Sequence, residues 1–144
     1  LAIQVPDRDA IRGRRVLVIE DGPTVTHGGM AHGAGLVAAR AAGAGEIVDP
    51  RPYAPAVLRD FYTMYPHLGP VLPAIGYSKD QLAAIADTIA AAAPEMVVSA
   101  TPIDLAALIA IRCPLARVRY EFVEDSAAAL SPWIDRFLAG LARS

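Results

Sequence analysis

The stretch VLVIEDGPTVTHGGM, at residues 16–30, decides how the fold of this chain is interpreted. It opens with four consecutive apolar residues. A strand of a parallel sheet that is covered on both faces shows such a run instead of the alternation of a half-buried strand. We therefore predict a buried strand over residues 16–19, ending in Glu20 and Asp21.

The rest of the chain alternates between short apolar runs and amphipathic stretches. After the first strand we expect a polar loop at residues 22–29, further strands at 46–49, 71–75, 96–100 and 116–123, and helices at 30–42, 57–65, 79–93, 105–111 and 131–141. Pro73 marks its strand as an edge or irregular piece, and Ser78 with Gln81 resembles a capping box. The last helix is expected to turn Trp133, Ile134, Phe137, Leu138 and Leu141 into the core. Alternation of this kind predicts a Rossmann-like, three-layer α/β fold, with about five mostly parallel strands between helices on both faces.

The composition indicates one ordinary globular domain. The chain has 144 residues, 54% of them hydrophobic and 19% charged, which is enough apolar material for a core. The net charge of −2 offers no basic footprint for nucleic acid, and no apolar run approaches the roughly 20 residues that span a bilayer. Because Cys113 has no second cysteine to pair with, we expect a reducing, cytoplasmic location.

Polar residues follow the first predicted strand, where ligands bind in open α/β sheets. Glu20 and Asp21 are suited to holding Mg²⁺ or orienting a water, and glycines at a helix start let backbone N–H groups approach an anion. The candidate residues that follow are Thr24, Thr26, His27, Gly28 and Gly29. This combination suits phosphate. The same residues also suit a simple turn, and Gly33 and Gly35 are equally compatible with close packing of helix on sheet.

Two later segments are expected at the same edge of the sheet. Arg51, between two prolines, is suited to pairing with a phosphate or carboxylate, although a surface salt bridge is the alternative. Thr101 and Asp104 follow the strand at 96–100, and Asp104 is alternatively a helix cap.

Several common motifs are missing from the sequence. No G-x-x-x-x-G-K-[ST] motif occurs, and no nucleophile elbow suggests a catalytic triad. We predict no metal site within the chain, because His27 and His32 lie in a glycine-rich segment and Cys113 stands alone.

Four strings, in one order, resemble a known family. They are VLVIEDGPTVTHGGM, IVDPRPYA, YPHLGPVLPAIGY and VVSATPIDL, and the similarity runs from about residue 14 to about residue 124. They resemble the C-terminal part of cyclic 2,3-diphosphoglycerate synthetase and its relatives, which are described as predicted P-loop GTPases. The resemblance implies a phosphate or substrate site that includes Asp21, Thr24, Thr26, His27, Gly28 and Gly29, faced by Arg51, Thr101 and Asp104. Asp21 and His27 are then the candidate catalytic residues.

The phosphate-binding loop of that family lies upstream of the matched segments and is absent from residues 1–144. We therefore expect the chain to be a single domain, the C-terminal part of a longer protein, which works with an N-terminal P-loop domain on a phosphorylated small molecule. Mg²⁺ with ATP or GTP is expected in the full-length protein, and no cofactor is expected for this chain alone, because phosphoryl transfer depends on the missing phosphate cradle.

Two other functions stay open at this stage. The first is a non-catalytic small-molecule-binding or oligomerisation module, in which alanine-rich helices pack against a partner or a second copy. The second is an enzyme that uses Asp21 and His27 as an acid/base pair without a nucleotide.

Overall fold

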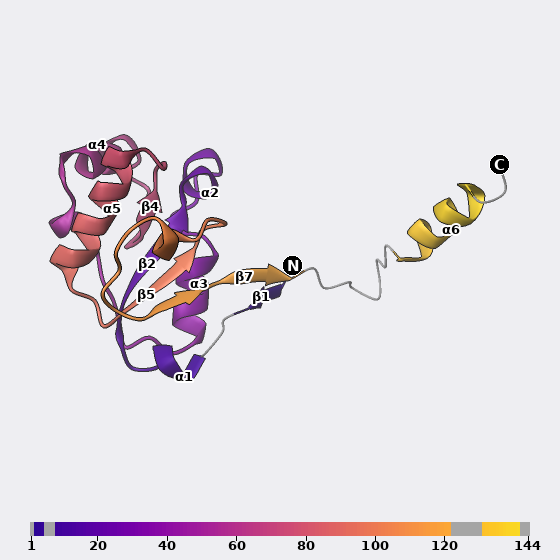
Figure 1. The fold of residues 1–144 in the computed structure, drawn as a ribbon, viewed down its shortest axis with the longest axis horizontal. Coiled ribbons are helices and arrows are strands. Elements are labelled where there is room, and N and C mark those ends of the chain that lie inside the picture. Colours follow the sequence, from indigo (N-terminus) through magenta and orange to yellow (C-terminus); the bar gives the residue numbers. More distant parts are fainter. Residues whose placement is uncertain (1, 5–7, 122–130, 142–144) are drawn as a thin grey trace.

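The computed structural model describes residues 2–4, 8–121 and 131–141 (Figure 1). The strands are β1 (Ala2–Gln4), β2 (Arg15–Asp21), β3 (Glu46–Ile47), β4 (Leu72–Ala74), β5 (Met96–Ala100), β6 (Leu115–Arg117) and β7 (Arg119–Glu121). The α-helices are α1 (Arg8–Ile11), α2 (Gly22–His27), α3 (Ala34–Ala41), α4 (Ala56–Met64), α5 (Lys79–Ala92) and α6 (Ser131–Leu141), and η1 (Arg51–Tyr53) and η2 (Leu105–Ala107) are 3₁₀ turns. All the helices described are too short or too polar to cross a lipid bilayer.

Strand β2 is the centre of a five-stranded sheet in which every pairing is parallel. On one side it pairs with β5, which in turn pairs with β6. On the other side β3 pairs with the start of β2, and β4 pairs with its end. Within the described residues β4 has no second strand neighbour, as expected for a strand that contains Pro73 and lacks its N–H. The predicted α/β architecture is confirmed.

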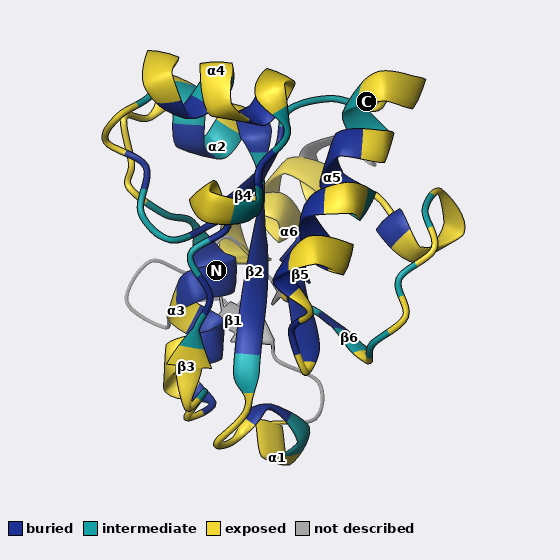
Figure 2. Cartoon of the chain, turned by 90° about the vertical axis from the view of Figure 1, so that its left-hand side faces the viewer, coloured by how far each residue is buried: buried dark blue, intermediate teal, exposed yellow. Residues whose placement is uncertain are grey.

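Both faces of β2 are buried, which confirms the interpretation of its apolar run (Figure 2). Val16 and Val18 pack in one core cluster with α3, while Leu17 and Ile19 pack in a second cluster with α4 and α5. Successive residues of a strand point to opposite faces, so a strand covered on both sides needs apolar residues at consecutive positions.

The start of α5 follows the predicted capping box. The Ser78 hydroxyl accepts a hydrogen bond from the Gln81 backbone N–H, and the Gln81 side chain accepts one from the Ser78 N–H. Two N–H groups that lack partners within the helix are thereby satisfied.

Two predicted elements have other structures. The polar loop expected at residues 22–29 is mostly the short helix α2, which Pro23 favours because its missing N–H costs nothing in a first helical turn. The helix expected at 105–111 is only the single turn η2.

The last predicted strand and the last helix also differ. The strand expected at 116–123 divides into β6, in the main sheet, and β7, which pairs with β1 in a separate antiparallel ribbon. Residues 122 and 123 of this predicted strand lie outside the described part.

Helix α6 forms, but Trp133, Ile134, Phe137 and Leu138 are exposed where core packing was expected. The sequence predicts an apolar face on this helix but does not reveal whether any part of the domain covers it. The side chain of Leu141, the fifth residue expected on that face, is not among those that the structure describes.

The close approach of α3 to the sheet depends on Gly35. A Cβ at this position would lie 2.9 Å from Val18 Cγ1, 3.1 Å from Ala100 Cβ and 3.2 Å from Glu20 Cδ. We predict that Gly35→Ala destabilises the domain by about 1–3 kcal/mol through overpacking, although alanine is the better helix former. Urea unfolding measures the change.

Val37→Ala is the matched control, since Val37 lies on the exposed side of the same helix. We expect its free energy of unfolding to stay within about 0.5 kcal/mol of the wild type. A Gly35→Ala variant as stable as the wild type would contradict the role of this contact.

Candidate functional site

A crevice lies at the carboxyl ends of β2 and β5. The register of these strands pairs Glu20 with Ala100, so the next residues, Asp21 and Thr101, lie side by side at this edge of the sheet. The hollow has a volume of about 480 Å³. It is lined by Asp21, Thr24, Ala100, Thr101, Pro102, Arg117, Val118 and Arg119. The segments that begin at Asp21 and Thr101 therefore share one crevice.

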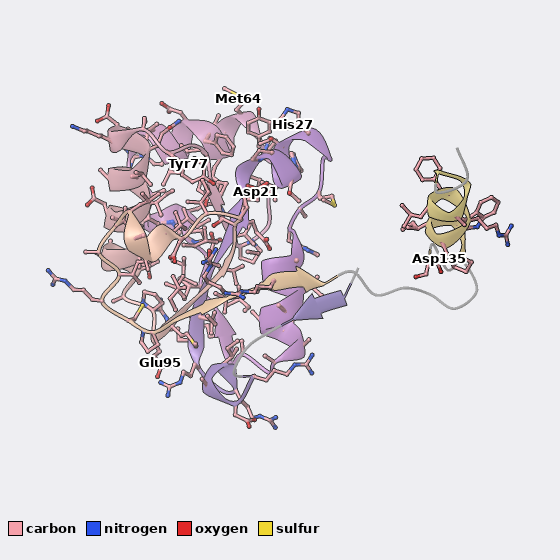
Figure 3. All side chains as sticks on the ribbon, turned by 45° about the vertical axis from the view of Figure 1, so that its right-hand side comes forward. Asp21, His27, Met64, Tyr77, Glu95 and Asp135 are labelled. Atoms are coloured by element: carbon pink, nitrogen blue, oxygen red, sulfur yellow. The ribbon has the colours of Figure 1, made fainter. Side chains whose placement is uncertain are left out.

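The acidic side of the crevice is Asp21, which precedes α2 (Figure 3). The Thr24 hydroxyl donates a hydrogen bond to Asp21 Oδ2 at 3.2 Å, which orients the carboxylate. Tyr77 lies near the same carboxylate. Burial and, to a smaller extent, the negative charge of Asp21 raise the pKa of the Tyr77 hydroxyl. The crevice thus presents one carboxylate with a fixed hydroxyl neighbour.

The basic side of the crevice consists of two arginines with different surroundings. Arg117 is held in place, with Nη1 3.3 Å from Asp104 Oδ2 and Nη2 donating to the Pro102 carbonyl at 3.2 Å. Arg119 is exposed and forms no ion pair with any side chain that the structure describes. Arg119 is therefore the guanidinium that is available to an anionic ligand.

The hydroxyl of Thr101 supports the turn of the crevice wall. It donates to the Ile103 carbonyl at 3.0 Å and lies 3.3 Å from the buried Ser99 hydroxyl. Thr101 is itself almost fully buried. These hydrogen bonds hold the turn after β5. The Thr101 hydroxyl is therefore used to position the crevice wall and is not a free hydrogen-bond donor for a ligand.

Glu20 does not face the crevice, although the sequence placed it beside Asp21 as a possible Mg²⁺ ligand. Its buried carboxylate accepts the backbone N–H of Gly35 at 3.1 Å and of Leu36 at 2.8 Å, at the start of α3. Burial raises the pKa of this carboxyl, while the backbone N–H groups of Leu36 and Gly35 act in the opposite direction. The N-terminus of α3, where a phosphate was expected, thus already holds a carboxyl group of the protein.

The remaining residues of the α2 region do not line the crevice. Thr26 donates to the Gly22 carbonyl at 2.9 Å, and His27 Nδ1 lies 3.2 Å from the Pro23 carbonyl. His27 is exposed at the far end of α2 from Asp21 (Figure 3), and Gly28 with Gly29 continues from there. The structure therefore does not bring Asp21 and His27 together as an acid/base pair.

Arg51 lies outside the crevice lining, in an ion pair with Asp49 at 2.7 Å. The hydrogen bond from Arg51 lowers the pKa of the Asp49 carboxyl and raises that of the guanidinium. Asp104 also lies outside the lining, and its side chain pairs with Arg117 without capping η2. Both residues are thus engaged by neighbours within the domain.

The metal-ligating groups at the crevice amount to one carboxylate. Among the described residues no group of three or more His, Cys, Asp or Glu side chains could hold a metal ion. Mg²⁺ is commonly bound by one or two carboxylates together with substrate phosphates. Asp21 fits the role of a single protein ligand, and the crevice supplies no complete cage.

Sequence reasoning missed Arg117 and Arg119 as site residues. In the sequence, Arg117 and Arg119 alternate with Val118 and Tyr120, and this alternation by itself indicates only a strand with one less buried face. The signal was nevertheless present, because arginines two residues apart lie on the same side of an extended chain. What the sequence could not supply was the pairing of β5 with β6, which places these arginines beside the turn at Thr101 and makes them part of the crevice wall.

The chain is similar to one curated protein, arginine synthetase ArcE from Thermococcus kodakarensis. The two are 49% identical over 122 residues, which are 85% of this chain. The matched part is 27% of that protein, so the chain spans about a quarter of its length. No family model matches the chain. No solved structure matches it either.

Glu20 gives the domain a specific pH dependence. A carboxyl whose pKa is raised on folding adds stability that is fully present below its unfolded pKa and is lost as pH rises through the folded value. We predict that wild type gains stability over Glu20→Gln as pH falls from neutral toward the ordinary pKa of glutamate. Urea unfolding at a series of pH values measures this difference.

Asp60→Asn, on the exposed side of α4, is the control for the loss of a carboxylate. The difference in free energy of unfolding between the wild type and Asp60→Asn should not grow as the pH falls. A difference between wild type and Glu20→Gln that narrows as pH falls would mean that the N–H groups of Gly35 and Leu36 outweigh the burial of the charge.

Proposed function

We propose that this chain is the substrate-binding domain of a nucleotide-dependent synthetase. The observation that carries the proposal is the crevice itself, in which the exposed guanidinium of Arg119 and the carboxylate of Asp21 line one hollow at the carboxyl edge of the sheet. Ligand sites of open α/β sheets lie at this edge. The relative named arginine synthetase supports the reaction class.

The proposed ligand carries an oxyanion. A guanidinium presents its N–H groups in a fork that matches both carboxylate and phosphate. The relative's name suggests an amino acid of the arginine type, whereas the resemblance to cyclic 2,3-diphosphoglycerate synthetase suggests a phosphorylated small molecule. In both cases Arg119 binds the oxyanion and Arg117 adds positive charge from a fixed position. Asp21 pairs with the positive group of an amino-acid ligand, whereas it repels a polyanionic one.

The nucleotide belongs, in this proposal, to another part of a longer protein. The start of α3 already holds the Glu20 carboxylate, and no P-loop sequence occurs in the chain. A P-loop domain would bring ATP or GTP with Mg²⁺ to the open side of the crevice, where Asp21 could serve as one Mg²⁺ ligand. When bound, the nucleotide supplies the phosphoryl group that activates a substrate oxygen.

A second function, an oligomerisation module, is favoured by one specific observation. Helix α6 exposes Trp133 and Phe137, which a self-contained domain would normally bury. Helix α6 does not line the crevice, so this function is compatible with the first.

The crevice can be tested on the chain itself by NMR titration with L-arginine and with 2,3-bisphosphoglycerate. We predict that Arg119→Ala weakens binding of whichever compound binds by about tenfold or more, because a hydrogen bond to a charged group contributes about 1.5–3 kcal/mol. Arg40→Ala, which removes an exposed arginine from α3, is the matched control and should leave the affinity within about twofold.

Asp21→Asn separates the two ligand classes. Loss of the carboxylate should weaken L-arginine binding, because a positive group loses its partner, and should strengthen 2,3-bisphosphoglycerate binding, because a like charge is removed. If neither compound perturbs the resonances of residues around the crevice, or if Arg119→Ala and Arg40→Ala behave alike, the proposal is wrong.

A further inference from the structure

Helix α6 presents an unpartnered apolar face. Trp133 and Phe137 are 68% and 67% exposed, and Ile134 and Leu138 lie beside them on the same side of the helix. In Figure 1 the helix lies apart from the sheet and its covering helices. Isolated helices shorter than about 12–15 residues are marginal in water, and α6 has 11 residues. This helix therefore needs a surface to pack against.

A second hollow of the domain has the matching character. It has a volume of about 520 Å³ and lies along the C-terminal half of α5, where Ala86 and Ala90 leave room for bulky side chains beside Ile89. Cys113 closes its other side. Because α5 ends just before β5 begins, this α5 groove lies at the amino edge of the sheet, opposite the crevice.

The charges of α6 and the α5 groove are complementary. Asp87 and Arg112 line the groove. Next to the apolar face of α6 are Asp135 (Figure 3) and Arg136, whose guanidinium carbon lies 5.4 Å from the centre of the Trp133 ring. With Trp133 in the groove, the helix and the groove would each offer one acidic and one basic side chain to the other.

We propose that α6 of one copy of this chain docks in the α5 groove of a second copy. The exchange is reciprocal, since each copy carries one helix and one groove, and it closes as a two-fold dimer. Each aromatic side chain buries about 150–250 Å². Four of them, with the surface that they cover, bury roughly 1,200–2,000 Å², which is the size of a stable protein interface.

Two substitutions on the exposed side of α5 test the dimer by sedimentation velocity. Ala90→Glu places a charge in the groove, whereas Ala83→Glu makes the same change at an exposed position of α5 outside the groove lining. We expect the wild type and Ala83→Glu to dimerise across the micromolar range and Ala90→Glu to weaken association at least tenfold. A monomeric wild type, or an Ala90→Glu variant that dimerises as well as the wild type, would overturn the proposal.

The single cysteine and the single tryptophan of the chain serve as probes that show which helix occupies the α5 groove. A variant with Ile134→Cys and Cys113→Ala, mixed with wild type and oxidised, should form a disulfide between chains at least tenfold faster than the same variant with Ala139→Cys, on the opposite side of α6, in place of Ile134→Cys. Trp133 emission should shift to the blue as the protein is concentrated. A concentration-independent blue shift that Ala90→Glu abolishes would instead show that α6 occupies the groove of its own chain, and would overturn the exchange.

Discussion

The arrangement of the site depends on one buried carboxylate. Glu20 accepts hydrogen bonds from the backbone N–H groups of Gly35 and Leu36, and so fixes the start of α3 against the end of β2. Side chains of successive strand residues point to opposite faces, so this bond directs Asp21 away from α3. A negative charge at a helix N-terminus is favourable, and here it offsets part of the cost of burial. The protein thereby uses one acid for structure, while its neighbour Asp21 lines the crevice.

The same division appears among the cations of the crevice. Arg117 is held by Asp104 and the Pro102 carbonyl, which fixes its charge beside the turn after β5. Arg119 has no such partner among the described side chains and is exposed. A guanidinium that is already paired sets the local potential, whereas an unpaired one is free to bind an oxyanion. This asymmetry supports the proposal that the domain binds a substrate through a carboxylate or phosphate group.

The two edges of the sheet carry different kinds of surface. The carboxyl edge has the polar crevice around Asp21 and Arg119, and the amino edge has the alanine-lined α5 groove. Assembly through the amino edge would leave the crevice open to a nucleotide-bearing domain. If the exposed aromatic face of α6 packs in the α5 groove, the dimer contact lies away from the crevice and does not compete with ligand binding there.

The sequence alone determined the layered architecture. The consecutive apolar residues of β2 predict a strand covered on both faces, and Ser78 with Gln81 sets the start of α5 through local hydrogen bonds. The sequence also indicated that Asp21 and Thr101 meet at one edge, since parallel strands align their carboxyl ends. These conclusions succeed because periodicity and capping depend on residues close together in the chain.

Only the tertiary structure decided how the polar groups are used. The sequence could not distinguish Glu20 as a helix cap from Asp21 as a crevice residue, because the difference lies in contacts 15 and 16 residues away. It also could not reveal that Arg119 lines the crevice, or that α6 leaves Trp133 exposed. Side-chain partners depend on which surfaces long-range packing brings together, and no local pattern encodes that choice.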